Sequence, residues 1–160
     1  MKYLSINKKE NGVCYLKLNR PEIHNAFDEV LISELSEFFS SSSSDSSITA
    51  IVVSGEGKSF CAGADLKWMK KMIDYSSEEN LSDSKKLAAM LSEMNLCRKP
   101  VVGLIDGATM GGGVGLASCF DFAVATERSF FALSEVKLGI LPAVISSIFP
   151  PILTFIKDGS

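Results

Sequence analysis

Two short runs of β-branched and apolar residues, at 48–54 (ITAIVVS) and 101–105 (VVGLI), limit the fold of this chain most strongly. Such runs are typical of strands buried in a sheet that helices cover. Between them, apolar residues from Leu87 to Met94 recur at helical spacing. This helix must end before Pro100, because the residue before a proline avoids helical geometry. Strand, helix and strand in this order indicate an α/β fold.

The N-terminal part of the chain predicts another strand and another helix. Apolar residues alternate with other residues over 13–18, up to a turn that contains a proline. Asn25 is predicted to cap the following helix, with Asp28 three residues later. The serine-rich stretch at 40–47 has little helix propensity and predicts a flexible connection. Two further strands are expected, at 120–126 and 130–133.

Composition and charge exclude several classes of protein. Of the 160 residues, 46% are hydrophobic and 22% are charged, which predicts one soluble globular domain. A net charge of -3 without a long basic run argues against a nucleic-acid partner. The uncharged run at 138–156 is near the length of a membrane span, but Pro142, Pro150 and Pro151 interrupt it. No membrane association is therefore predicted.

The cysteines and the single histidine limit the chemistry. The four cysteines stand far apart without a CxxC pair, and the N-terminus lacks an apolar signal region, which predicts reduced thiols in a cytoplasmic protein. Their simplest role is that of small buried hydrophobic residues. With His24 as its one histidine, the chain is poorly suited to a Ser-His-Asp triad or a multi-histidine metal site. Neither a metal nor a separate cofactor is expected, and any chemistry falls to carboxylates and backbone groups.

Two glycine-containing stretches approach nucleotide-binding motifs but fail on spacing. The stretch GEGKS at 55–59 matches the end of a P-loop, yet Val52 occupies the position of the first glycine. Gly111 and Gly113 are placed for a dinucleotide-binding GxG, yet Leu116 stands where the third glycine is required. Neither nucleoside triphosphate binding nor dinucleotide binding is predicted.

Small residues recur in one further pattern, between a predicted strand and a predicted helix. They occupy 62–64 (AGA) and 111–113 (GGG). Without large side chains, backbone N–H groups lie open to a ligand atom, and the start of a helix adds partial positive charge. Two such N–H groups that converge on one oxygen would form an oxyanion hole. Close packing of helices on a sheet explains the same pattern equally well.

Three longer stretches carry a more specific signal: FCAGADLKWM at 60–69, PVVGLIDGATMGGGVGLASCFDFAVAT at 100–126 and FALSEVKLGILPA at 131–143. With these motifs, the sequence from about residue 3 to 146 resembles the enoyl-CoA hydratase/isomerase family, also called the crotonase family. The resemblance implies a spiral of repeated β-β-α units that binds an acyl-CoA thioester. The residues around the glycines are most similar to the bacterial methylglutaconyl-CoA hydratase branch, which acts in leucine degradation.

The resemblance also implies which residues act on the thioester. The N–H groups of Ala64 and Gly112 would hold the thioester oxygen while it becomes an enolate. Lys67 would lie near the phosphates of coenzyme A, which is part of the substrate and not a separate cofactor. The expected contacts with coenzyme A are Glu22, Ile23, Ala62, Gly63, Ala64, Asp65, Leu66, Lys67 and Gly112.

Many hydratases of the family use two glutamates to position water and to transfer protons. By the resemblance, Glu135 stands at the second of these positions and is the expected catalytic acid and base. Gly115 stands at the first position, so a two-glutamate mechanism is excluded. Two mechanisms remain open: hydration with Glu135 alone, which is favoured, and Δ3-Δ2-enoyl-CoA isomerisation with one glutamate as the base.

The resemblance ends near residue 146. Residues 1–146 are expected to form the N-terminal part of the family fold, and residues 147–160 (SIFPPILTFIKDGS) a divergent tail without the usual C-terminal helices. In the family these C-terminal helices help to build trimers or hexamers. The implied homo-oligomer therefore depends on helices that the sequence at 147–160 does not match. A third hypothesis is therefore a truncated, catalytically inactive remnant that keeps a coenzyme A site.

Overall fold

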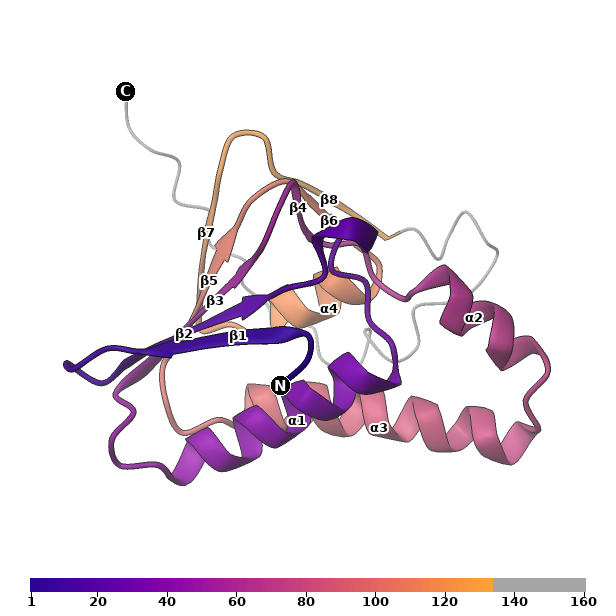
Figure 1. The fold of residues 1–160 in the computed structure, drawn as a ribbon, viewed down its shortest axis with the longest axis horizontal. Helices are drawn as coiled ribbons and strands as arrows, with labels where there is room; N and C mark the ends of the chain where they lie inside the picture. Colours follow the sequence, from indigo (N-terminus) through magenta and orange to yellow (C-terminus); the bar gives the residue numbers. More distant parts are fainter. Residues whose placement is uncertain (134–160) are drawn as a thin grey trace.

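The computed structural model describes residues 1–133, which form two β-sheets and the helices beside them (Figure 1). Glu135 and the predicted tail at 147–160 lie outside the described residues. The strands are β1 (Leu4–Lys8), β2 (Val13–Leu18), β3 (Ala50–Gly55), β4 (Ser59–Cys61), β5 (Val101–Ile105), β6 (Ala108–Met110), β7 (Phe122–Ala125) and β8 (Phe130–Ala132). The helices are η1 (Pro21–Ile23, a 3-10 helix), α1 (Glu29–Ser44), α2 (Leu66–Ile73), α3 (Ser77–Asn95) and α4 (Gly112–Ser118).

After β2, the chain repeats a unit of two strands and a helical segment. β3 and β4 precede α2 and α3, β5 and β6 precede α4, and β7 and β8 begin the next unit. The larger sheet has the order β1-β2-β3-β5-β7, and the smaller sheet has the order β4-β6-β8. Strands of successive units pair in parallel in both sheets. The chain thus advances by one strand in each sheet with every unit, which confirms the predicted α/β spiral of β-β-α units.

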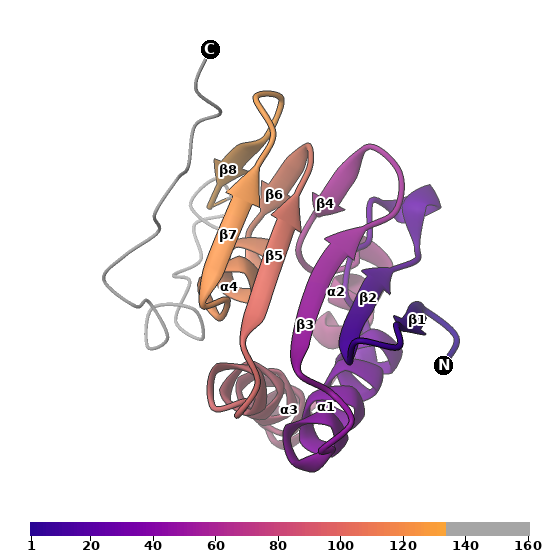
Figure 2. The same cartoon turned by 90° about the vertical axis from the view of Figure 1, so that its left-hand side faces the viewer.

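The larger sheet is buried on one face only. In β2, Cys14, Leu16 and Leu18 are buried, while the alternate residues Tyr15 and Lys17 are exposed. Figure 2 shows this sheet face on, with β7, β5, β3 and β2 side by side and no labelled helix in front of them. The predicted strands at 48–54 and 101–105 exist as β3 and β5, but the residues on their outer face are half-buried or exposed, because the described helices lie on the other side.

The start of α1 differs from the prediction. The cap is Asp28 and not Asn25: the Asp28 Oδ1 accepts hydrogen bonds from the N–H groups of Val30 (3.0 Å) and Leu31 (2.9 Å). Asn25 has a left-handed backbone with a φ of 55°. Its buried side chain instead binds backbone groups of other segments, which a sequence pattern alone does not reveal.

The serine-rich stretch also differs from the prediction. α1 continues to Ser44, so most of the expected flexible connection is helical. Phe38, Phe39 and Ser42 are buried on the inner side of this helix. Burial of an apolar face stabilises a helix more than intrinsic propensity does, and here it outweighs the weak propensity of serine.

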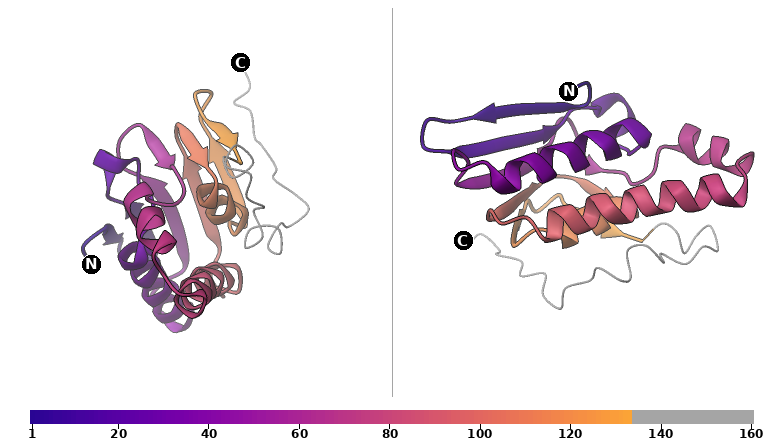
Figure 3. Two further views of the ribbon diagram at one scale, coloured as in Figure 1. Left: turned by 90° about the vertical axis from the view of Figure 1, so that its right-hand side faces the viewer. Right: turned by 90° about the horizontal axis from the view of Figure 1, so that it is seen from below.

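α1 and α3 lie side by side under the sheets (Figure 3). The helix predicted around Leu87 to Met94 is confirmed as α3, and it ends at Asn95, before Pro100. Met90, Leu91 and Met94 are buried in the same core cluster as the apolar face of α1. Among residues 1–133, no helix is both long and apolar enough to cross a membrane.

Candidate active site

Two backbone segments, each with a positive-φ glycine, lie next to each other beyond the ends of paired strands. β4 and β6 are parallel neighbours, so both chains leave the smaller sheet at the same edge. Each then passes through a glycine with a positive φ, which is 89° at Gly63 and 50° at Gly111. L side chains rarely adopt such a backbone, which explains the glycines. The next residues are the two predicted donors, Ala64 and Gly112.

The N–H group of Ala64 points away from the protein segment that holds it. Ala64 forms an isolated parallel bridge with Phe27. In this bridge the Phe27 N–H donates to the Gly63 carbonyl (2.7 Å), and the Asp65 N–H donates to the Phe27 carbonyl (2.8 Å). Because the flanking residues make the bonds of a parallel bridge, the N–H of Ala64 faces the opposite side. Within residues 1–133, this N–H donates no hydrogen bond.

Among residues 1–133, the N–H group of Gly112 also lacks an acceptor, for a different reason. Gly112 is the first residue of α4, and the first N–H groups of a helix have no acceptor inside it. Gly111 precedes Gly112 as the cap, and the side-chain caps of helices accept from the second or third N–H and not from the first. The Gly111 carbonyl accepts hydrogen bonds from the N–H groups of Val114 (2.9 Å) and Gly115 (3.4 Å), which lie further along the helix. Gly112 therefore presents a second donor without a partner in the described part of the chain.

The two segments touch through their backbones. A Cβ atom added to Gly63 would lie 3.3 Å from the Gly112 nitrogen and 2.8 Å from the Met110 carbonyl oxygen. A Cβ atom added to Gly113 would lie 2.4 Å from the Cys61 carbonyl oxygen. Gly63 and Gly113 are buried, whereas the donor residues Ala64 and Gly112 are half-buried. The structure thus brings both predicted donors together at an accessible point.

A buried ion cluster supports the first segment. The Arg20 Nη2 atom lies 2.9 Å from the Asp28 Oδ2 and 3.4 Å from the Asp65 Oδ2. Asp65 also caps α2, because its Oδ1 accepts the N–H groups of Lys67 (2.7 Å) and Trp68 (3.4 Å). The carboxylate of Asp65 is therefore engaged inside the protein, and so is its backbone: the N–H donates to the Phe27 carbonyl (2.8 Å), and the carbonyl accepts a hydrogen bond from the Met69 N–H (2.8 Å).

The other predicted contacts with coenzyme A lie on adjoining segments. The N–H of Ala62 donates to the His24 carbonyl (2.9 Å), which places the end of β4 beside η1. Glu22, in η1, is exposed, and so is Lys67 in the first turn of α2. Ile23 is half-buried, and the Leu66 side chain is 72% exposed. The segment after β4 and the end of η1 are thus neighbours, although they are distant in the sequence.

The cysteine thiols near the site are not nucleophiles. Burial raises the pKa of the Cys61 thiol to about 12, and the thiol donates to the Asn25 carbonyl (3.2 Å). Burial likewise raises the pKa of Cys119 to about 12. Both stay protonated at neutral pH. Cys14, Cys61 and Cys119 are buried and Cys97 is partly exposed, which confirms the prediction of mostly buried cysteines.

Gly115 is buried in α4, one turn after Gly112. Residues three apart on a helix share a face, so a side chain at position 115 would lie on the same face of α4 as Gly112. It carries no side chain there, and Glu135 lies outside the described residues. In the described part of the site, α4 therefore contributes a backbone donor and no carboxylate.

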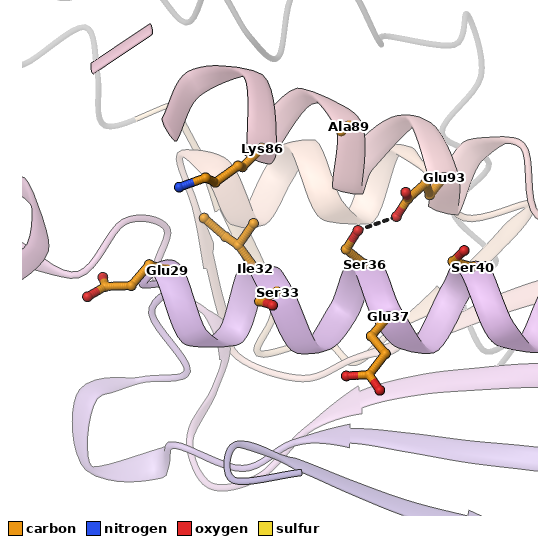
Figure 4. A pocket seen from close by; sticks show the side chains of 9 residues that line it. All are labelled: Glu29, Ile32, Ser33, Ser36, Glu37, Ser40, Lys86, Ala89 and Glu93. Atoms are coloured by element: carbon orange, nitrogen blue, oxygen red, sulfur yellow. Dashed lines mark hydrogen bonds between the residues drawn. The ribbon is translucent and has the colours of Figure 1, made fainter. Parts of the chain in front are cut away.

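A surface groove of about 390 Å³ lies elsewhere, between α1 and α3 (Figure 4). Figure 4 shows the Ser36 hydroxyl donating to the Glu93 carboxylate across it. Its lining residues all belong to these two helices, and none is a predicted site residue. They are Glu29, Ile32, Ser33, Ser36, Glu37, Ser40, Lys86, Ala89 and Glu93. The groove is therefore separate from the candidate active site.

A family model described as enoyl-CoA hydratase/isomerase matches residues 8–155. The chain belongs to the enoyl-CoA hydratase/isomerase family. Solved members of this family share its fold. A crystal structure of an enoyl-CoA hydratase from Shewanella pealeana is similar to this chain with a TM-score of 0.88 at 43% identity, over 92% of this chain and 55% of that chain.

Curated members of the enoyl-CoA hydratase/isomerase family differ in their reactions. An enoyl-CoA hydratase from Alternaria alternata is 39% identical over 138 residues, which are 86% of this chain and 44% of the relative. A mitochondrial Delta(3,5)-Delta(2,4)-dienoyl-CoA isomerase from Mus musculus is 34% identical over 148 residues, again 86% and 44%. The chain thus spans about half the length of the relatives it matches.

Two contributors to the site were not identified from the sequence. Phe27 orients Ala64 through the bridge, and Arg20 joins the caps of α1 and α2. A capping signal was present at Asp65, an aspartate directly before an apolar helical stretch. The bridge has no such signal, because Phe27 is indistinguishable by its type from any other core residue.

Proposed function

We propose that this chain adds water across the 2,3 double bond of an enoyl-CoA thioester. The observation that carries the proposal is the pair of adjoining N–H groups at Ala64 and Gly112, both without an acceptor in the described part of the chain. Donors that are fixed before the reaction stabilise charge that develops in the transition state. Loss of one such donor lowers kcat by about 100- to 1,000-fold in other enzymes.

In the proposed reaction, the thioester oxygen accepts hydrogen bonds from the N–H groups of Ala64 and Gly112. The oxygen of water bonds to carbon 3 of the enoyl group, and the Glu135 carboxylate takes a proton from that water. The electrons of the double bond move toward the thioester, which forms an enolate with its negative charge on the held oxygen. A proton then returns to carbon 2, giving a 3-hydroxyacyl-CoA. The role of Glu135 rests on the family resemblance.

Isomerisation of a 3-enoyl-CoA to a 2-enoyl-CoA is the second candidate. It uses the same enolate, but one base removes a proton from carbon 2 and a proton is returned to carbon 4. Gly115 favours this candidate, because the residue adds no second carboxylate to the site. The similarity to a dienoyl-CoA isomerase supports it as well. A third candidate, an inactive remnant that binds coenzyme A, predicts binding without turnover.

As the substrate we propose 3-methylglutaconyl-CoA. The residues around Gly112 and Glu135 are similar to those of the methylglutaconyl-CoA hydratase branch of the family. A cytoplasmic location and assembly into a homo-oligomer are further parts of the proposal. Coenzyme A enters as part of the substrate. The segment from Ala62 to Lys67 and the neighbouring Glu22 and Ile23 are proposed to contact it.

The test mixes the purified protein with 3-methylglutaconyl-CoA or a short 2-enoyl-CoA and follows the absorbance of the conjugated thioester. Hydration predicts loss of this absorbance, and isomerisation predicts its gain from a 3-enoyl-CoA. Glu135→Gln is expected to abolish either change. Glu10→Gln, in the exposed β1–β2 turn, is the matched control and should leave the rate unchanged. A folded protein that produces neither change would contradict both enzymatic candidates.

A further inference from the structure

Arg20 is a buried charged residue at the centre of the polar network beside the candidate site. Only 6% of its surface is exposed. Its Nη1 donates to the Ala26 carbonyl (2.7 Å), and the guanidinium lies 4.0 Å from the centre of the Tyr3 ring. Its Nη2 lies between the carboxylates of Asp28 and Asp65. An arginine buried in this way stabilises a specific arrangement of its partners, because its fork of donors has a fixed shape.

In both aspartates, the two carboxylate oxygens have separate partners. In each, Oδ1 caps a helix: Asp28 caps α1, and Asp65 caps α2. In each, Oδ2 lies next to the Arg20 Nη2. Arg20 therefore joins the first turns of two helices through one nitrogen atom.

This link lies directly beside the Ala64 donor. Phe27 pairs with Ala64 in the parallel bridge, and Asp28 and Asp65 are the residues that follow them. The two carboxylates thus follow the two residues of an isolated bridge, and like charges that lie close together repel each other. The positive charge of Arg20 lies between them. Without it, this repulsion would act to separate the two chain segments at the bridge that orients the Ala64 N–H.

We infer that Arg20 is a positioning residue for the oxyanion hole, which it acts on through Asp28 and Asp65. The inference rests on the proposed function, because it concerns the donor that the proposed reaction uses. Arg20 itself does not touch the donor. Its removal changes where the Ala64 N–H points and leaves the contacts of Lys67 and Glu22 with coenzyme A in place.

Four variants separate positioning from general stability. Arg20→Met removes the charge, and Arg20→Lys keeps the charge but loses the fork. Asp65→Asn keeps an oxygen that caps α2 but gives up the ion pair, so it tests the link if Arg20→Met does not fold. Arg128→Met is the matched control, because Arg128 is an exposed arginine that pairs with Asp106 outside the site.

The first readout needs binding but no turnover. Butyryl-CoA labelled with ¹³C at the thioester carbonyl is added to each protein, and the carbonyl stretch of the bound ligand is recorded by infrared difference spectroscopy. Hydrogen bonds to the carbonyl oxygen lower this frequency, so the wild-type protein should shift it downward. Arg20→Met and Asp65→Asn should lose most of the shift, Arg20→Lys should keep part of it, and Arg128→Met should keep all of it.

The second readout is turnover of the 2-enoyl-CoA. A donor that is displaced but not removed should cost about 10- to 100-fold in kcat, with a much smaller change in KM. A full wild-type shift in folded Arg20→Met or Asp65→Asn would overturn the positioning role and leave the oxyanion hole intact. No shift in the wild-type protein would overturn the proposed oxyanion hole and the positioning role with it.

Discussion

The two segments that present the donors each pass through a positive-φ glycine but are held by different forces. At the first segment, polar side chains surround Ala64: Asp65 caps α2, and Arg20 ties that cap to α1. At the second segment, Gly111 caps α4 without a side chain. Gly112 and Gly113 instead lie close to Phe27 and Cys61, so that packing holds the turn.

The burial of the two helices explains this difference. Of α2, only Trp68 is buried, so packing alone holds its start weakly. Of α4, every residue after Gly112 is buried. A helix inside the core is held by its neighbours on all sides, whereas a helix at the surface needs caps and ion pairs to fix its first turn. One site can thus combine two equivalent donors that respond to different mutations.

The largest effect is expected from Gly63→Ala. The new Cβ would meet the Met110 carbonyl oxygen at 2.8 Å, on a backbone whose φ of 89° disfavours a side chain. Strain and overpacking together should lower the free energy of unfolding by about 2 to 4 kcal/mol. They should also move both donors and abolish turnover. Urea unfolding and the absorbance assay measure the two losses.

Gly12→Ala is the control for this strain. Gly12 also has a positive φ, of 83°, and its added Cβ would meet Thr49 in the connection before β3. It should lower stability without changing the activity of the folded fraction. A Gly63→Ala protein with normal activity would contradict the placement of the two donors.

Gly112→Ala should have the next largest effect, through packing alone. Its Cβ would lie 2.5 Å from the Phe27 Cε2, and the backbone there has no positive φ. The expected loss in unfolding free energy is about 1 to 3 kcal/mol. Phe27→Leu should make room for the new methyl group. In a double-mutant cycle, the two changes should couple by about 0.5 to 3 kcal/mol, and strict additivity would show that the ring is not the obstacle.

Two substitutions of Asp65 separate the contribution of the α2 cap from that of the ion pair with Arg20. Asp65→Ala removes the cap of α2 and the ion pair, whereas Asp65→Asn removes only the ion pair. The alanine variant should therefore be less stable than the asparagine variant by about 1 kcal/mol, the usual value of a helix cap. Urea unfolding of both variants measures this difference. Equal stabilities would mean that the cap contributes nothing and the ion pair alone holds α2.

The smallest effect concerns Asp106, in the turn that leads to the second segment. Hydrogen bonds from Arg128 and then Thr126 lower the pKa of this carboxyl from 3.8 to about 2. Because the pKa is lowered in the folded state, the stabilisation is complete above about pH 4 and is lost as the pH falls through 2. The pair is exposed, so its contribution is small.

The measurement compares the stability of the wild-type protein and Asp106→Asn from pH 5 to pH 2. The wild-type protein should be slightly more stable at pH 5, and the difference should disappear toward pH 2. Added salt should reduce the difference at pH 5, because it screens exposed charges. A difference that stays constant over this range would contradict the assigned pKa.

The sequence allowed the strands and the apolar helix faces to be predicted, because period and residue type encode them locally. β3, β5 and α3 lie where those patterns are. The choice between Asn25 and Asp28 as a cap was wrong, since both residue types cap helices and only the contacts of Asn25 with distant carbonyl groups exclude it. The end of α1 was missed for a similar reason, because burial of Phe39 outweighs the propensity of the serines.

The sequence by itself determined where backbone N–H groups could be accessible to a ligand, because the small residues around Ala64 and Gly112 can be read directly from it. Only the tertiary structure decided which way these donors point and what holds them. The Phe27 bridge to Ala64 and the pairing of Arg20 with Asp65, 45 residues apart, arise because the spiral returns the chain beside an earlier turn. Contacts of this kind depend on the packing of whole β-β-α units, and no local spacing along the chain records them.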